Sequence, residues 1–342
     1  MMRPAPGMLW TLLGLLPVNV GTAGERTEFT WPTPHPAWNE GRPAASFLQH
    51  AGSGDPASGG FGGVRSGGIK FHEGTDITPV GRDRSGEATD PIFAAMTGVV
   101  RHINTSAGDS GYGRYIVLEH PEQTPAIYTL YGHLARIAPG LRAGERVARG
   151  QVIGTMGRSA GGYAIPKERA HLHFETGVMV TRDFQTWYAR RKFGSPNEQG
   201  LWNGMNLMGF DALDFLRLWR EKRVDNFEDY FKQMKPVVTL RIATMVTPDF
   251  VIRYPTLLTK ERPLGPLAGW EIKFNWTGVP FAWTPLTLNE VVGLPRDQPR
   301  ILAVDAEEER RQRSKALVVS RGGNWSVGKD LETVLQQLFG LR

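Results

Sequence analysis

The segment AHLHFETG, residues 170–177, contains two of the chain's eight histidines, with a single leucine between them. Its composition predicts a β-strand, in which residues two apart point to the same face. His171 and His173 therefore share one face, and Leu172 points to the opposite face, which we expect to lie against a hydrophobic core. The strand would present two imidazoles side by side.

Upstream of this segment, from Phe61 onward, the chain is a succession of short runs of β-forming residues. Gly, Pro or Asp residues bound the runs, which is typical of strands joined by turns. The runs are PIFAAMTGVVRHI (91–103), RYIVLEH (114–120), AIYTLYGHL (126–134) and QVIGTMG (151–157). They predict an antiparallel β domain from residue 61 to about residue 177.

The segments on either side of this domain have a different composition. Residues 24–60 are rich in Pro, Gly, Ser and Ala, and they predict an exported linker or a loosely packed lead-in. Residues 211–223 and 225–235 each have amphipathic spacing, so we expect two short helices, the second of them capped by Asp225. We take residues 221–236 as a helical linker.

Residues 237–342 predict a smaller C-terminal α+β domain, which we expect to be an accessory domain, and its role is open. A charged stretch at 307–315 interrupts it and is typical of a solvated helix or loop. The last segment predicts a helix with Asp330 as its N-cap and one apolar face. The β-like runs are 237–246, 270–276, 300–305 and 315–320, and the apolar face consists of Leu331, Val334, Leu335, Leu338 and Phe339.

The bulk properties limit the possible functions. A length of 342 residues allows two domains, and a net charge of +6 without a long basic stripe argues against a nucleic-acid binder. The same charge suits contact with an anionic bacterial wall or lipid surface. The chain has no cysteine, so any metal site must use histidine and carboxylate ligands.

The first residues resemble an export signal. One arginine precedes an apolar run from Met8 to Val20, and small residues follow it, which predicts a signal peptide over residues 1–23. The alternative is an uncleaved anchor, but Pro17 interrupts the run and the run is short for a membrane span. We therefore expect a secreted or periplasmic protein without stable membrane insertion after cleavage.

Three segments of the β domain carry candidate metal chemistry. In an extended strand His72 and Asp76 would lie roughly 13 Å apart, so they could share a metal only if the chain turns at Gly74. His133 follows Gly132 in a third segment. Two histidines and one aspartate are a usual zinc set, which leaves the fourth position to a water that the metal activates. Spacing alone does not decide which of His171 and His173 would bind the metal, and a His-x-His pair can also be structural.

The order of these motifs resembles the M23 family of zinc metallopeptidases, of the lysostaphin and LytM type. The motifs are HEGTD (72–76), YGHL (131–134), VARGQVIGTMG (147–157) and HLHFE (171–175). The resemblance implies one zinc ion per chain, bound by His72, Asp76 and His173, with His133 and His171 as the catalytic residues.

The resemblance also implies a fold and a substrate. It predicts a mainly antiparallel β, LytM/lysostaphin-like catalytic domain over residues 61–220, with its core at 61–180 and an excursion at 181–206. The implied activity is that of an exported zinc metalloendopeptidase that cuts peptidoglycan peptides. Two alternatives are a non-catalytic M23-like regulator of another wall hydrolase and a wall-binding protein that acts through residues 237–342. The loops after Asp76 and before His171 are longer than is usual in the family, so substrate preference does not carry over.

Overall fold

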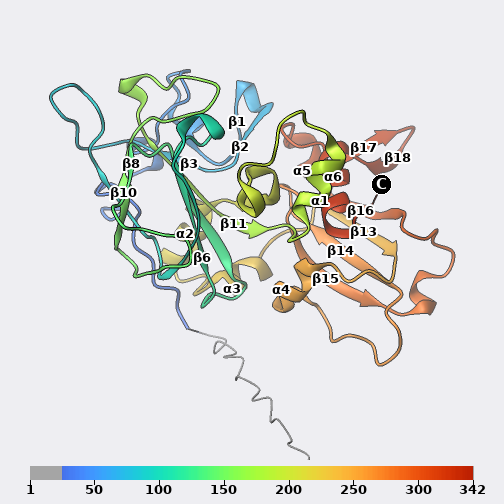
Figure 1. Ribbon diagram of the computed structural model, residues 1–342. Coiled ribbons are helices and arrows are strands. Elements are labelled where there is room, and N and C mark those ends of the chain that lie inside the picture. The colour runs from blue at the N-terminus through green and yellow to red at the C-terminus, as the bar shows by residue number, and fades with distance from the viewer. Residues whose placement is uncertain (1–24, 342) are drawn as a thin grey trace, which may run out of the picture.

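The computed structural model describes residues 25–341, so the predicted signal peptide lies outside the described residues. The blue-to-green N-terminal part and the orange-to-red C-terminal part lie side by side (Figure 1). Within residues 25–341, no helix combines the length and the apolar character that crossing a membrane requires.

The largest sheet of the N-terminal part has seven strands. Its order is β12-β11-β7-β6-β5-β9, all neighbours are antiparallel, and β3 pairs with β11. The strands are β3 (Thr75–Ile77), β5 (Gly98–Asn104), β6 (Tyr115–His120), β7 (Ile127–Gly132), β9 (Arg146–Val147), β11 (Leu172–Met179) and β12 (Leu207–Phe210). The predicted antiparallel β domain is confirmed.

Strand β11 is the central element of this sheet, and every residue in it is buried. One of its edges pairs with β7, whereas the other pairs first with β3 and then with β12. In this register His173 lies opposite Asp76 on one side and Gly132 on the other. The strand therefore brings three distant motifs of the sequence to one place.

Two smaller sheets complete the N-terminal part. The run predicted at 91–103 holds two strands in different sheets, one that ends at Phe93 and one that begins at Gly98. Between them, the Ala94 amide donates to the Gln151 carbonyl and the Ala95 amide donates to the Tyr131 hydroxyl. The remaining strands are β4 (Pro91–Phe93), β8 (Arg136–Ile137) and β10 (Val152–Thr155) in one sheet, and β1 (Gly62–Arg65) and β2 (Lys70–His72) in the other.

Three helices follow β11: α1 (Phe184–Arg191), α2 (Ala212–Arg220) and α3 (Phe227–Lys232). The two amphipathic helices are confirmed, but the cap of the second is not Asp225. The side chain of Asn226 accepts the Asp229 amide instead, and the Asp229 carboxylate accepts the Asp225 amide. Asn226 is the N-cap because it directly precedes Phe227, the first residue of the helix.

Residues 237–341, which we call the C-terminal unit, contain a four-stranded antiparallel sheet, a two-stranded hairpin and three helices. The sheet order is β15-β14-β13-β16. The elements are β13 (Val238–Ala243), α4 (Asp249–Arg253), β14 (Gly269–Phe274), β15 (Pro280–Leu286), β16 (Pro299–Val304), α5 (Ala306–Arg311), β17 (Val318–Arg321), β18 (Asn324–Val327) and α6 (Lys329–Phe339). The predicted α+β character and the apolar face of the last helix are confirmed, because all five of its predicted residues are buried.

The predicted N-cap of that helix is wrong. Gly328 stands at the N-cap, and Asp330 lies inside the first turn. The Asp330 carboxylate accepts the amide of Ala316, so it ties the helix to the preceding loop.

The lead-in is more tightly packed than its composition predicts. Trp31 and Phe47 are buried in the core, and Trp31 stacks on Trp38 with ring centroids 5.2 Å apart. Leu48 forms a β-bridge with Ile77, next to Asp76. The expectation of loose packing is wrong because three aromatic side chains anchor a segment that is otherwise rich in Gly and Pro.

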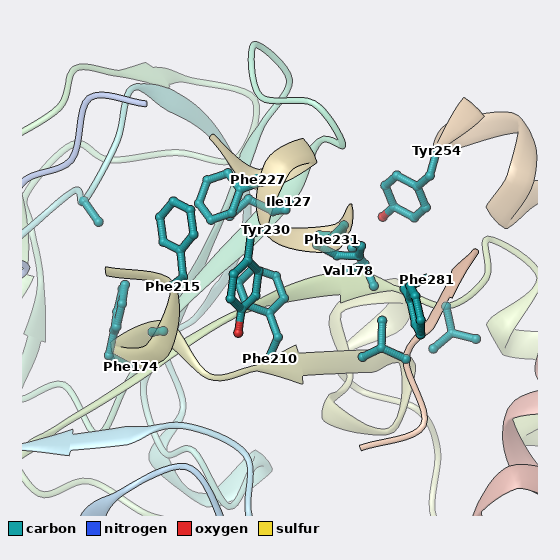
Figure 2. Close-up of a cluster of buried hydrophobic side chains, with 14 of the residues drawn as sticks. Ile127, Phe174, Val178, Phe210, Phe215, Phe227, Tyr230, Phe231, Tyr254 and Phe281 are labelled. Carbon is teal, nitrogen blue, oxygen red and sulfur yellow. The ribbon is translucent and has the colours of Figure 1, made fainter. Parts of the chain in front are cut away.

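The two parts of the molecule share one hydrophobic core. Val178 and Phe231 of the N-terminal part lie in the same cluster of buried residues as Tyr254 and Phe281 of the C-terminal unit (Figure 2). The Tyr254 hydroxyl accepts the Met179 amide at 3.1 Å. The C-terminal unit is therefore packed against β11, the strand that carries His173.

Candidate metal centre

Three side chains point their donor atoms at one position. His72 Nε2 lies 3.1 Å from Asp76 Oδ1 and 3.1 Å from His173 Nδ1, and His173 Nδ1 lies 3.0 Å from Asp76 Oδ1. All three residues are buried, and these atoms fall within 4.8 Å of one another. Among residues 25–341, this is the group of histidine and carboxylate side chains that could hold a metal ion.

Local backbone structure explains why these three meet. His72 ends β2, Asp76 lies in β3, and the turn predicted at Gly74 joins the two strands. A Cβ atom on Gly74 would stand 2.8 Å from the His173 ring, so a larger residue there would push the imidazole away. Glycine is required by this close approach.

In both histidines, the ring nitrogen that points away from the shared position forms a hydrogen bond, and this bond fixes the orientation of the imidazole. His72 Nδ1 donates to the Gly60 carbonyl at 2.7 Å, and His173 Nε2 donates to the Glu175 carboxylate at 2.8 Å. A carbonyl or carboxylate oxygen can only accept, so these nitrogens carry the proton. The other ring nitrogens, His72 Nε2 and His173 Nδ1, then face Asp76. Two imidazole nitrogens and one carboxylate oxygen with an open fourth direction fit zinc.

His133 and His171 lie beside this group. Their rings are 4.7 Å apart, and His171 Nε2 is 3.5 Å from Asp76 Oδ1. His133 Nδ1 donates to the Ser159 carbonyl at 2.8 Å and His171 Nδ1 to the Arg169 carbonyl at 2.7 Å. Both residues therefore keep an unprotonated Nε2. His133 adopts φ 60° at the end of β7, a left-handed conformation that ends the strand at this side chain.

Burial and neighbouring charges set the protonation of the group. Burial, with the nearby imidazoles of His171 and His173, holds the pKa of His133 well below its ordinary value, and burial also lowers the pKa of His171. Although burial opposes ionisation, the imidazoles of His171 and His72 hold the pKa of Asp76 well below its usual range. His133 and His171 are thus neutral and Asp76 is ionised at neutral pH.

His173 behaves in the opposite way. Burial lowers its pKa, but the carboxylates of Asp76 and Glu175 outweigh this and raise it to about 10 in the metal-free protein. A cation held at Nδ1 would replace that proton, which is the usual exchange at a histidine ligand.

All five residues singled out in the sequence therefore meet, and three further residues join them. Arg65 Nη2 donates to Asp76 Oδ2 at 2.5 Å, and Tyr112 lies with its ring 5.4 Å from that of His173. Glu175 bonds His173, and alternation along the strand could have indicated it because it shares the face of both histidines. Arg65 gives no such signal, because only the fold brings it near.

The group opens into a large cleft of about 1330 Å³. One side carries the metal-site residues, Arg65 and Tyr163, and the other carries residues of the C-terminal unit such as Lys315, Val334 and Gln337. The cleft therefore lies where the two parts of the molecule meet, and both contribute to its walls.

Comparison with known proteins agrees with these observations. Residues 70–183 match the model of Peptidase family M23, so the predicted resemblance is confirmed for that segment. Over 111 residues the chain is 38% identical to the peptidoglycan DD-endopeptidase ShyC of Vibrio cholerae serotype O1, covering 32% of this chain and 21% of ShyC. The chain thus spans about a fifth of the length of this curated relative.

Similar solved structures include a zinc-containing peptidase from Vibrio cholerae, with 25% identity and a TM-score of 0.29 over 44% of this chain and 37% of that one. Another is the catalytic domain of the antimicrobial peptidase lysostaphin from Staphylococcus simulans, with 20% identity and a TM-score of 0.29 over 46% of this chain and 89% of that one.

Proposed function

We propose that this chain, whose residues 70–183 match peptidase family M23, is an exported zinc metalloendopeptidase that hydrolyses peptide bonds of peptidoglycan. The observation that carries the proposal is the convergence of His72 Nε2, Asp76 Oδ1 and His173 Nδ1. In each of these side chains the other polar atom already forms a hydrogen bond. Such outer bonds orient metal ligands and fix their tautomers.

The side chains of the centre divide the work of hydrolysis. Zinc held by His72, Asp76 and His173 would acidify a water molecule and polarise the scissile carbonyl. His133 and His171 are neutral and keep Nε2 unprotonated, so they are suited to accept a proton and later to return one to the leaving amine. Their Nδ1 bonds to backbone carbonyls hold both rings in that orientation.

The choice of substrate rests on similarity and on charge. ShyC is a peptidoglycan DD-endopeptidase, and the matched segment contains all five residues of the centre. A net charge of +6 favours association with an anionic wall, and the predicted signal peptide over residues 1–23 favours export.

The test combines metal analysis with digestion of purified peptidoglycan. The parent chain should hold one zinc per chain and release fragments that mass spectrometry identifies as products of peptide-bond cleavage. His72→Ala, Asp76→Ala and His173→Ala should each lose most of the zinc and the activity. His102→Ala is the control, because His102 bonds Gln199 and lies outside the centre. Full zinc in all three ligand variants, or products cut in the glycan, would refute the proposal.

A further inference from the structure

The short hairpin formed by β1 and β2, residues 62–72, supplies two groups to the metal centre. His72 at its end is one of the three converging residues, and Arg65 donates to the outer oxygen of Asp76. Arg65 also donates from Nε to the Ser58 carbonyl at 2.9 Å. The position of this hairpin therefore affects two of the three proposed ligands.

The hairpin has little support of its own. Within the described residues, β1 and β2 pair only with each other, and Gly67 and Gly68 both adopt positive φ in the connection between them. An isolated two-stranded hairpin is marginally stable in water at best. Something outside the hairpin must hold it in place.

The C-terminal unit provides this support at close range. A Cβ atom on Gly62 would stand 2.5 Å from the Trp276 ring, and one on Gly63 would stand 2.6 Å from Ser314 Oγ. Arg313 Nη2 donates to the Gly67 carbonyl at 2.8 Å. The first strand and the connecting loop of the hairpin thus lie directly on the C-terminal unit.

The second strand is held through Phe71, the residue before His72. Its ring lies 5.9 Å from that of Trp276 and 5.3 Å from that of Phe61, and the Lys315 ammonium stands 4.2 Å from its centroid. Aromatic pairs and a cation over a ring each contribute attraction beyond the apolar area that they bury. These contacts act one residue away from a proposed ligand.

The supporting turn of the C-terminal unit is held by hydrogen bonds of its own. The buried side chain of Gln312 accepts the amides of Ser314 and Lys315 and the Ser314 hydroxyl, and it donates to the Trp276 carbonyl. One amide group thereby fixes the turn 312–315 and joins it to Trp276. The hairpin packs on a surface that is already ordered.

We propose that the C-terminal unit is a positioning element of the metal centre. Trp276 and the turn 312–315 hold the hairpin in place. Arg65 then keeps its hydrogen bond to Asp76, and His72 Nε2 stays close to the donor atoms of Asp76 and His173. The proposal rests on the proposed function only in taking zinc as the metal. It assigns these residues an indirect role, because none of them reaches the converging donor atoms.

The test measures zinc affinity by competition with a chelator, with no peptide present. Outer partners of metal ligands are typically worth about 10–100-fold in metal affinity. Arg65→Ala should lose affinity in that range, and Trp276→Ala and Arg313→Ala should each lose about tenfold. Arg310→Ala is the matched control, because Arg310 is exposed on α5 and lies outside the turn. Trp276→Phe should restore most of the affinity.

A second measurement separates positioning from general instability. Hydrogen exchange of residues 62–72 in the metal-free protein should speed up in Trp276→Ala and Arg313→Ala, while exchange in β11 stays as in the parent. Excess zinc should restore activity in both variants.

If either variant keeps the affinity and exchange of the parent within about twofold, the proposal is wrong for that contact. If Trp276→Ala does not fold, Arg313→Ala decides the question. A parent chain that binds zinc but cuts no peptide would refute the proposed function and leave this inference intact.

Discussion

His133 and His171 differ from the three proposed ligands in where their free nitrogens lie. His171 Nε2 is 3.5 Å from Asp76 Oδ1, whereas His173 Nδ1 is at 3.0 Å and lies in the converging group. We therefore expect His133→Ala and His171→Ala to bind zinc nearly as well as the parent. Both should lose about 10²–10⁴-fold in turnover, the usual size of general acid–base assistance. Zinc analysis and a peptide cleavage assay check this. Loss of zinc in His171→Ala with retention in His173→Ala would mean that the two roles are exchanged.

His120 allows a prediction about stability and pH. Its Nδ1 donates to the Thr97 carbonyl, its Nε2 lies 2.8 Å from the Thr129 hydroxyl oxygen, and burial lowers its pKa to about 4. The unfolded chain, with a pKa near 6.5, takes up the proton first, so stability is present above pH 6.5 and is lost as the pH falls toward 4. A shift of this size corresponds to on the order of 3 kcal/mol.

The variant His120→Gln keeps hydrogen-bonding capacity but does not titrate. Urea unfolding at a series of pH values should show the parent losing about 3 kcal/mol more than this variant between pH 6.5 and 4. Parallel pH profiles for the two proteins would show that His120 is not buried in its neutral form.

At the level of single residues, the sequence predicts those members of the centre that a motif or the alternation along a strand identifies. All five predicted residues come together because β11 pairs with β3 and β7 in the register that places His173 between Asp76 and Gly132. Arg65 could not be predicted, because its contact with Asp76 depends on how the hairpin folds back. Its role appears only once packing is known.

At the level of elements, predictions failed where local chemistry conflicts with the tertiary position. Strand β15 was not predicted because its sequence contains Pro280 and Pro285, which cannot donate to a ladder. It forms nevertheless because it is an edge strand of the sheet order β15-β14-β13-β16. Strands with alternating or continuous apolar residues and no proline, such as β6 and β7, were predicted within a residue or two.

The start of α3 provides a prediction at this scale. The side chain of Asn226 accepts the Asp229 amide at 2.9 Å, whereas Asp225 forms an exposed ion pair with Arg26. Asn226→Ala should lower the free energy of unfolding by about 1 kcal/mol, the typical value of an N-cap. Asp225→Ala should change it by less than about 0.5 kcal/mol, because exposed pairs contribute little. Chemical denaturation of both variants checks this, and the reverse order would restore Asp225 as the cap.

For the whole molecule, composition indicated two parts but not how they join. The boundary near residue 236 coincides with the end of the helical segment, so a separate accessory unit is a reasonable expectation from the sequence. The main cluster of buried residues spans both parts and includes Ile77, Val178, Trp270 and Phe281. A sequence pattern shows which faces are apolar, but it does not show that two apolar faces cover each other.

The last prediction concerns removal of the C-terminal unit. A chain that ends at Lys235 would uncover Val178 and Phe231, and it would leave the Met179 amide without the Tyr254 hydroxyl. It would also lose the Arg253 guanidinium, which donates to the Met179 and Val180 carbonyls at 2.9 and 3.0 Å. Each hydrogen bond exchanged for one to water costs about 0.5–1.5 kcal/mol, and the newly exposed apolar surface adds to this.

Together these losses amount to a large part of the free energy of unfolding of a typical domain, about 5–15 kcal/mol. We therefore expect the truncated chain to lack a cooperative unfolding transition and to bind zinc poorly. The matched control is the full chain with a protease site inserted after Lys235. Once cut, its two pieces should stay together through gel filtration and keep the zinc, because the interface is intact. If the truncated chain instead unfolds cooperatively, holds one zinc and cleaves small peptides, residues 237–342 are an accessory domain that can be removed, and the shared core contributes little to the metal centre.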